Sequence, residues 1–270
     1  TTIYTVDGID AAGCVGTDQV TVTVNPLPTA TIAGSANVCI GDPSPTVTFT
    51  GAGGTSPYVF TYNINGGGNQ TITSVGTTAT IAVPTGAAGT FVYNLVSVLD
   101  ASAAACSQVQ TGSATIVVNP LPTATIAGTV DLCVGDPAAT ITFTGANGTA
   151  PYTFTYTLNG GANQTVTSVG TTATITVPTG TAGTFSYNLV SVQDASSTTC
   201  SQLQVGNATV VVNPLPTAAI AGTVDLCVGD PAATIAFTGA NGTAPYTFTY
   251  TLNGGANQTI TSAFLSATTI

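Results

Sequence analysis

The chain has 270 residues, of which 4% are charged, and all ten charged side chains are aspartates, so the formal net charge is −10. Lys, Arg, His and Glu are absent. Without cationic side chains the chain cannot neutralise phosphates, and without imidazole it lacks the general base and the metal ligand that many enzymes use. The composition therefore excludes nucleic-acid binding and most enzyme mechanisms, and it leaves divalent cations as the natural counterions.

Apolar residues make up 43% of the chain, which is a globular composition, and the mean hydropathy is +0.44. Such a value raises the question of a membrane protein. However, Thr, Gly, Asn or Pro interrupts every apolar run well before the ~18 residues that a membrane-spanning helix needs. We therefore expect no membrane insertion.

A tandem repeat organises the whole chain. The segment Asn-Pro-Leu-Pro-Thr-Ala begins at Asn25, Asn119 and Asn213, and both intervals (119 − 25 and 213 − 119) are 94 residues. The sequence therefore predicts two complete repeats, at 25–118 and 119–212. Residues 1–24 match the end of a repeat, and residues 213–270 match the beginning of another.

The predicted elements are all strands. Residues 1–24 should supply the last two strands of a sandwich, and the segments 46–50, 58–62 and 79–83 alternate with period two, as half-buried strands do. Phe91, Tyr93 and Leu95 fall on one face of a later strand, which we expect to be a core face. Residues 213–270 should hold the first four or five strands of a further sandwich. Gly, Asn and Pro clusters mark the turns between strands.

About seven short strands for each repeat is typical of an immunoglobulin-like β-sandwich. The fold class we predict is therefore all-β, with tandem immunoglobulin-like sandwiches. The two prolines in each Asn-Pro-Leu-Pro link favour an extended connection. We expect an elongated rod in which each sandwich adds roughly 35 to 45 Å.

Several segments carry a resemblance to a known group of proteins: residues 4–14, 19–26, 38–42 and 149–156. They resemble the immunoglobulin-like and PKD-like repeats of giant cell-surface adhesins of Bacteroidota. The resemblance implies an extracellular, cell-surface adhesin or filament that is exported by the type IX route and serves gliding and attachment. Similar modules also act as spacers in secreted enzymes, and the motifs do not separate these roles.

Two functions follow as hypotheses. The first is a structural, non-catalytic stalk or filament of a surface adhesin, whose partners are neighbouring repeats of the same polypeptide or fibre. The second is a carbohydrate- or surface-binding module, for which Tyr58, Tyr62 and Tyr93 could stack on surface glycans. Their alternate placement on strands favours a core role instead. Tyr93 also resembles the corner tyrosine of immunoglobulin domains, whose hydroxyl group ties back to the chain.

Six cysteines, two for each repeat, indicate disulfides in an exported protein. Pairing within each repeat would give Cys39–Cys106 and Cys133–Cys200, which is the pairing we favour. An immunoglobulin-like topology, however, places these partners at opposite ends of a sandwich, roughly 25 Å apart. A disulfide between repeats, Cys39–Cys200, and free thiols are therefore the alternatives.

The aspartates recur at equivalent positions in the repeats. Asp42, Asp100, Asp136 and Asp194 are candidate calcium ligands at the junctions between repeats, since Ca²⁺ takes six to eight oxygen ligands. The alternative is turn chemistry, in which each carboxylate accepts hydrogen bonds from the nearby backbone. Asp42 and Asp100 could also be proposed as the carboxylate pair of a glycosidase, but they recur like structural parts. We expect no catalytic residue and no cofactor other than calcium.

Because 1–24 and 213–270 each hold part of a sandwich, we expect something to cover their apolar faces and strand edges. In the first alternative, a longer polypeptide supplies the missing strands. In the second, the head of one chain fits the tail of another, as donor strands do in assembled fibres.

Overall fold

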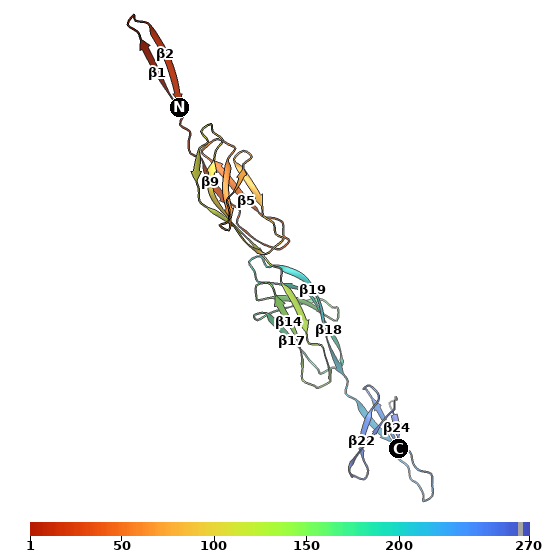
Figure 1. Cartoon of the computed structure of the whole chain (residues 1–270). Helices are drawn as coiled ribbons and strands as arrows, with labels where there is room; N and C mark the ends of the chain where they lie inside the picture. The colour runs from red at the N-terminus through yellow and green to blue at the C-terminus, as the bar shows by residue number, and fades with distance from the viewer. Residues whose placement is uncertain (264–266) are drawn as a thin grey trace. The chain divides into compact units, whose positions relative to one another are not determined.

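The computed structural model describes residues 1–263 and 267–270, and within them the regular structure consists of β-strands alone (Figure 1). The described chain divides into two compact units. Unit 1 comprises Thr1–Leu121 and Ser196–Cys200, and unit 2 comprises Pro122–Ala195 and Ser201–Ile270. Within the described residues no helix has the length and the apolar character needed to cross a membrane.

Unit 1 begins with an antiparallel hairpin of β1 (Thr2–Ile9) and β2 (Val15–Val22), which forms a sheet of its own. The first repeat follows as two sheets. The smaller sheet has the order β3-β5-β8, and the larger has the order β4-β11-β9-β6-β7 with β10 beside β9. Their bounds are β3 (Thr29–Ala33), β4 (Ala36–Cys39), β5 (Thr46–Ala52), β6 (Val59–Ile64), β7 (Gln70–Thr73), β8 (Thr78–Ala82), β9 (Gly89–Leu99), β10 (Ser107–Val109) and β11 (Ser113–Asn119).

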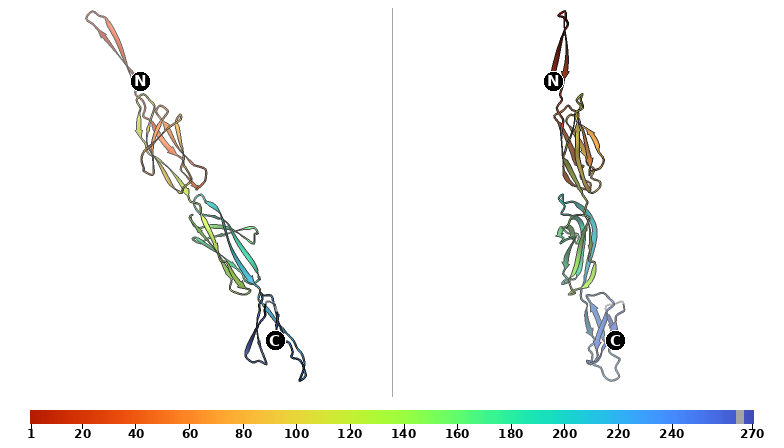
Figure 2. Two further views of the ribbon diagram at one scale, coloured as in Figure 1. Left: turned by 45° about the vertical axis from the view of Figure 1, so that its right-hand side comes forward. Right: turned by 60° about the vertical axis from the view of Figure 1, so that its left-hand side comes forward.

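In unit 2 the second repeat has the same arrangement, with sheets of order β12-β14-β17 and β13-β19-β18-β15-β16. Figure 2 shows this repeat from two further sides, in green to cyan. Its strands are β12 (Thr123–Ala127), β13 (Val130–Cys133), β14 (Ala139–Ala146), β15 (Thr153–Leu158), β16 (Asn163–Thr167), β17 (Thr172–Val177), β18 (Gly183–Gln193) and β19 (Ser201–Asn213). Residues 213–270, which we call the third fragment, form β20 (Thr217–Ala221), β21 (Ala236–Ala240), β22 (Thr247–Thr251), β23 (Asn257–Thr261) and β24 (Ala267–Thr269).

The strand order is that of an immunoglobulin-like sandwich. The opening segment of each repeat is shared between the two sheets, because β3 pairs antiparallel with β5, whereas β4 pairs parallel with the last strand, β11. The predicted all-β, immunoglobulin-like class is therefore confirmed. The strands expected at 46–50, 58–62 and 79–83 are found as β5, β6 and β8 with small shifts of their ends.

Alternating burial along the strands builds the core of each repeat. On β5 the side chains of Val47 and Phe49 are fully buried and the threonines on either side of each are not, as the period-two pattern predicts. The ring of Phe49 stacks on that of Phe60 with a centroid distance of 5.6 Å, and the second repeat reproduces this contact. Tyr93 and Leu95 are also buried, which confirms the core face expected on β9.

Candidate functional site

The structure contains one disulfide among the described residues, between Cys39 of the first repeat and Cys200 of the second. Their Cα atoms lie 5.7 Å apart, within the usual range for a disulfide, and they are 161 residues apart in the sequence. The loop segment Ser196–Cys200 consequently belongs to unit 1 rather than to unit 2. The alternative of a bond between repeats is therefore the one that the structure shows.

The favoured pairing within repeats, Cys39–Cys106 and Cys133–Cys200, is wrong. Cys39 ends β4 beside Asn119, at the end of the sheet where β9 begins. Cys106 follows the other end of β9, where its carbonyl accepts a hydrogen bond from the backbone N–H of Asp100. Since β9 has 11 residues, strand geometry separates the two ends by about 33 Å, far beyond the reach of a disulfide.

Asp42 fixes the backbone of Cys39. Its carboxylate Oδ2 accepts a hydrogen bond from the Cys39 N–H at 2.7 Å, and its own N–H donates to the Cys39 carbonyl at 3.1 Å. Asp136 and Asp230 make the same contact with the cysteines three residues before them, Cys133 and Cys227, at 2.8 and 2.7 Å. The structure therefore supports turn chemistry for the Gly-Asp-Pro segments, and every repeat orients its first cysteine in the same way.

The loop that carries Cys200 docks through a threonine. Thr198 Oγ1 lies 3.3 Å from Cys39 Sγ and 3.2 Å from Cys200 Sγ, and it accepts a hydrogen bond from Asn119 Nδ2 at 3.0 Å. Neither Thr198 nor Asn119 was singled out by the sequence analysis. For Asn119 the sequence offered one signal, its position in the repeated Asn-Pro-Leu-Pro segment. For Thr198 it offered none, because the residue is not repeated: the first repeat has Ala104 at the equivalent position.

Asp100 organises the equivalent loop of the first repeat. Its carboxylate accepts hydrogen bonds from the Ser102 hydroxyl at 2.8 Å and from the backbone N–H groups of Cys106 at 2.9 Å and Thr55 at 3.1 Å. Burial alone would raise the pKa of Asp100, but these hydrogen bonds outweigh it and hold the pKa below its ordinary value. Asp194 makes the corresponding contact with the Thr149 N–H at 3.0 Å.

The structure gives no support to a calcium site at these aspartates. Asp42 and Asp100 lie at opposite ends of β9, so they cannot act as the carboxylate pair of a glycosidase. Across residues 1–263 and 267–270, no three His, Cys, Asp or Glu side chains gather closely enough to hold a metal ion. The carboxylate oxygens described above bind backbone N–H groups instead.

The tyrosines proposed for sugar stacking lie in the core. Tyr58, Tyr62 and Tyr93 are all buried, so they present no aromatic platform to solvent. Tyr93 has a raised pKa, first because burial disfavours the phenolate and second because of the neighbouring Tyr62 hydroxyl. The tie to the backbone expected of Tyr93 is made by Tyr58, whose hydroxyl donates to the Gly54 carbonyl at 2.9 Å.

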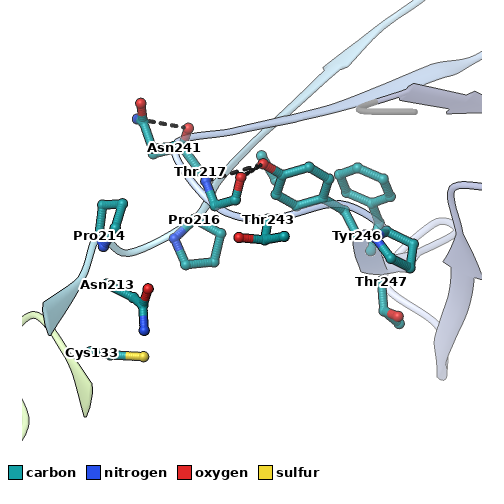
Figure 3. Close-up of a pocket in the computed structure, with 13 residues that line it drawn as sticks. Cys133, Asn213, Pro214, Pro216, Thr217, Asn241, Thr243, Tyr246 and Thr247 are labelled. Carbon is teal, nitrogen blue, oxygen red and sulfur yellow. Dashed lines mark hydrogen bonds between the residues drawn. The ribbon is translucent and has the colours of Figure 1, made fainter. Parts of the chain in front are cut away.

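The remaining cysteines are thiols. Cys14, Cys133 and Cys227 are exposed and Cys106 is partly buried. Cys133 and Asn213 line one side of a groove of about 490 Å³ in unit 2, and the segment around Tyr246 lines the other side (Figure 3). Here Asn213 Nδ2 donates to the Leu132 carbonyl at 3.2 Å, whereas its counterpart Asn119 binds Thr198.

Comparisons with known proteins establish no family. No protein-family model matches the chain, and no curated protein is similar to it at a significant level.

Solved structures of similar architecture exist at low similarity. One is the tetra-tandem repeat from the extending region of a large adhesion protein, with 15% identity, 99% of this chain and 72% of that chain covered, and a TM-score of 0.32. Another is the Escherichia coli adhesin FdeC, with 14% identity, coverage of 89% and 88%, and a TM-score of 0.34. A third comprises the fibronectin(III)-like modules of CbhA from Clostridium thermocellum, with 14% identity, coverage of 69% and 95%, and a TM-score of 0.29. Likenesses of this size do not assign a function to the chain.

Proposed function

We propose that this chain is a structural, non-catalytic stalk of a bacterial surface adhesin, in which each immunoglobulin-like repeat adds length. The disulfide Cys39–Cys200 is the observation that carries the proposal. It covalently joins two successive repeats, which a module built to bind a ligand does not require, whereas a fibre under tension gains from it. A disulfide also suits an extracellular, oxidising environment.

The use of the polar and aromatic side chains supports the same function. The aspartates of the turns bind backbone N–H groups, and the tyrosines of the strands lie in the core. A carbohydrate-binding module would instead need exposed aromatic and polar groups arranged around a concave site. Export by the type IX route and origin in Bacteroidota remain part of the proposal and rest on the resemblance of the repeats.

Pulling on the two ends of a single chain tests the proposal. With the disulfide intact, the segment between Cys39 and Cys200, which are 161 positions apart in the sequence, is shielded from the force, so unfolding cannot extend it. Reduction should add about 550 Å of contour length, at 3.3 to 3.6 Å for each residue. The variant Cys39→Ser should give the long extension with or without reductant.

Equal extensions of the oxidised and reduced chains would show that the disulfide does not carry the force between the repeats. A glycan array probed with the same chain separates the two functions, because a stalk should bind no glycan on the array. Saturable binding of one sugar would favour the carbohydrate-binding alternative.

A further inference from the structure

The disulfide between the repeats is nearly closed to solvent, and its two cysteines are not equally covered. Cys200 is 1% exposed, whereas Cys39 is 8% exposed. In thiol–disulfide exchange a thiolate attacks one sulfur atom of a disulfide, and the other sulfur atom leaves as a thiolate. A reducing thiol therefore reaches Cys39 more readily, and Cys200 is the cysteine that leaves with the negative charge.

A thiolate at Cys200 needs a hydrogen-bond donor, because a buried charge without one is costly. Two hydroxyl groups lie near Cys200 Sγ: Thr198 Oγ1 at 3.2 Å and Ser196 Oγ at 3.7 Å. Thr198 Oγ1 also lies 3.3 Å from Cys39 Sγ. One hydroxyl group thus contacts both sulfur atoms of the bond.

The contacts of Thr198 make its hydroxyl group a donor to sulfur. Asn119 Nδ2 offers only protons and lies 3.0 Å from Thr198 Oγ1, so the hydroxyl oxygen accepts this hydrogen bond. A disulfide sulfur carries no proton, and both sulfur atoms lie closer to Thr198 Oγ1 than Ser196 Oγ does, at 3.4 Å. The hydroxyl proton is therefore directed at the disulfide, where it can stabilise charge that develops on sulfur.

The equivalent loop of the first repeat offers a natural comparison. In both loops a serine hydroxyl group lies 3.7 Å from the cysteine sulfur. At the position of Thr198, however, the first repeat has Ala104, which carries no hydroxyl group. The serine is thus common to the two loops, and the threonine belongs to the loop that forms the disulfide.

We propose that the Thr198 hydroxyl group, oriented by Asn119, assists reversible thiol–disulfide exchange at Cys39–Cys200, so that the junction between the two repeats is a lock that external thiols open and external disulfides close. The inference rests on the contacts of the disulfide. It concerns the regulation of the bond to which the proposed stalk function assigns the force.

The exchange has two steps. An external thiolate attacks Cys39 Sγ, the sulfur–sulfur bond breaks, and its electron pair leaves on Cys200 Sγ, to which Thr198 donates. A second external thiolate attacks the external sulfur of this mixed disulfide, which releases Cys39 as a thiolate and forms an external disulfide. The external thiols are oxidised, the two cysteines are reduced, and water protonates their thiolates. Closing runs the same steps in reverse, with the external disulfide as oxidant.

A purely structural role of Thr198 would predict the opposite effect on the rate. If the threonine only held the loop 196–200 against Asn119, removing its hydroxyl group would loosen the loop and expose the disulfide, so reduction would become faster. If the hydroxyl group stabilises the leaving thiolate, its removal leaves the charge without this hydrogen bond, so reduction becomes slower. The direction of the change therefore separates the two roles.

The test measures how fast dithiothreitol reduces the folded 270-residue chain. The thiols of the oxidised chain are first blocked with an alkylating reagent, and the two thiols that reduction then releases are labelled with a second reagent and counted by intact mass spectrometry. Thr198→Val keeps the branched shape without the hydroxyl group and should slow reduction roughly fivefold. Thr198→Ser keeps the hydroxyl group and should react at the rate of the parent chain.

Two further variants complete the design. Asn119→Ala leaves the hydroxyl group without its orienting donor, so its rate should fall between those of the parent chain and Thr198→Val. Thr174→Val, at an exposed position of β17, is the matched control and should change nothing. The urea midpoints of the reduced chains check that the variants fold alike. Thr198→Ala, which carries the residue of the first repeat, stands beside Thr198→Val if valine disturbs the loop, and it too should react more slowly than Thr198→Ser.

The proposal is overturned if the valine and alanine variants are reduced as fast as the parent chain or faster. It is also overturned if Thr198→Ser is as slow as Thr198→Ala, because these two variants differ only by the hydroxyl group. The rate of reduction in solution does not depend on whether the bond carries force. The pulling experiment can therefore fail while this test succeeds, and the reverse.

Discussion

Individual aspartates act in this protein as acceptors for backbone N–H groups, and this use makes stability depend on pH. Asp100 is the clearest case, because its carboxylate accepts hydrogen bonds from Ser102, Cys106 and Thr55 and its pKa is lowered in the folded chain. An unfolded Asp has a pKa of about 3.9. The stabilisation by Asp100 is therefore fully present above that value and is lost as the pH falls through the lower pKa of the folded state.

We predict that Asp100→Asn lowers the urea midpoint of the first repeat at pH 7 and flattens its dependence on pH below about 4. An amide offers one acceptor oxygen where the carboxylate offers two, so a backbone N–H would face the amide NH₂ group. Urea titrations followed by tyrosine fluorescence between pH 2 and 7 measure both effects. Asp131→Asn, at an exposed position, is the control. A variant as stable as the parent at every pH would contradict the role given to Asp100.

A glycine lies directly beneath a tyrosine ring in each repeat. A Cβ placed on Gly51 of β5 would come within 2.5 Å of the Tyr58 ring, and Gly145 and Gly239 stand in the same relation to Tyr152 and Tyr246. The tyrosine can reach the Gly54 carbonyl with its hydroxyl because its ring rests on the bare backbone of Gly51. The glycine is therefore a packing requirement.

We predict that Gly51→Ala destabilises the first repeat by about 1–3 kcal/mol, the usual cost of forcing an extra carbon into a packed core. The matched control is Gly68→Ala, where an added Cβ meets no atom within 4 Å. Thermal or urea unfolding of both variants gives the comparison. Equal stabilities for the two would show that the Tyr58 ring moves aside without cost.

Among the elements, the strands were predictable and the junction was not. The alternation along 46–50 and 58–62 is a local pattern, and burial on one face of β5 and β6 follows directly from it. The short strand β4 was missed because its four residues carry no such pattern and are held by parallel pairing with β11. The partner of Cys39 lies 161 residues away in the sequence, on a loop of the next repeat. Local sequence patterns do not show which loop comes close to Cys39.

The groove of the third fragment was likewise outside the reach of sequence patterns. Pro216, Gly242 and Tyr246 line it, yet in the second repeat the counterparts of these residues serve internal packing and hydrogen bonding. The repeat pattern did indicate that 1–24 and 213–270 each hold part of a sandwich. Only the coordinates showed that the hairpin pairs Tyr4 with Val20 as the second repeat pairs Tyr187 with Ala208, and that no other sheet of the described residues pairs with the hairpin.

For the whole molecule, the cysteines fall into two kinds. Cys39 and Cys200 form the disulfide between the two repeats, and Cys14, Cys106, Cys133 and Cys227 are thiols. Because reduction of a disulfide yields two thiols, the number of thiols shows directly which cysteines are bonded.

We predict that a thiol reagent under denaturing conditions titrates about four thiols for each oxidised chain and about six after reduction. The variant Cys39→Ser should raise the first value to about five, because Cys200 loses its partner. An oxidised chain with only about two thiols would mean that Cys39–Cys106 and Cys133–Cys200 form within the repeats instead, and the covalent link between the repeats would then be wrong.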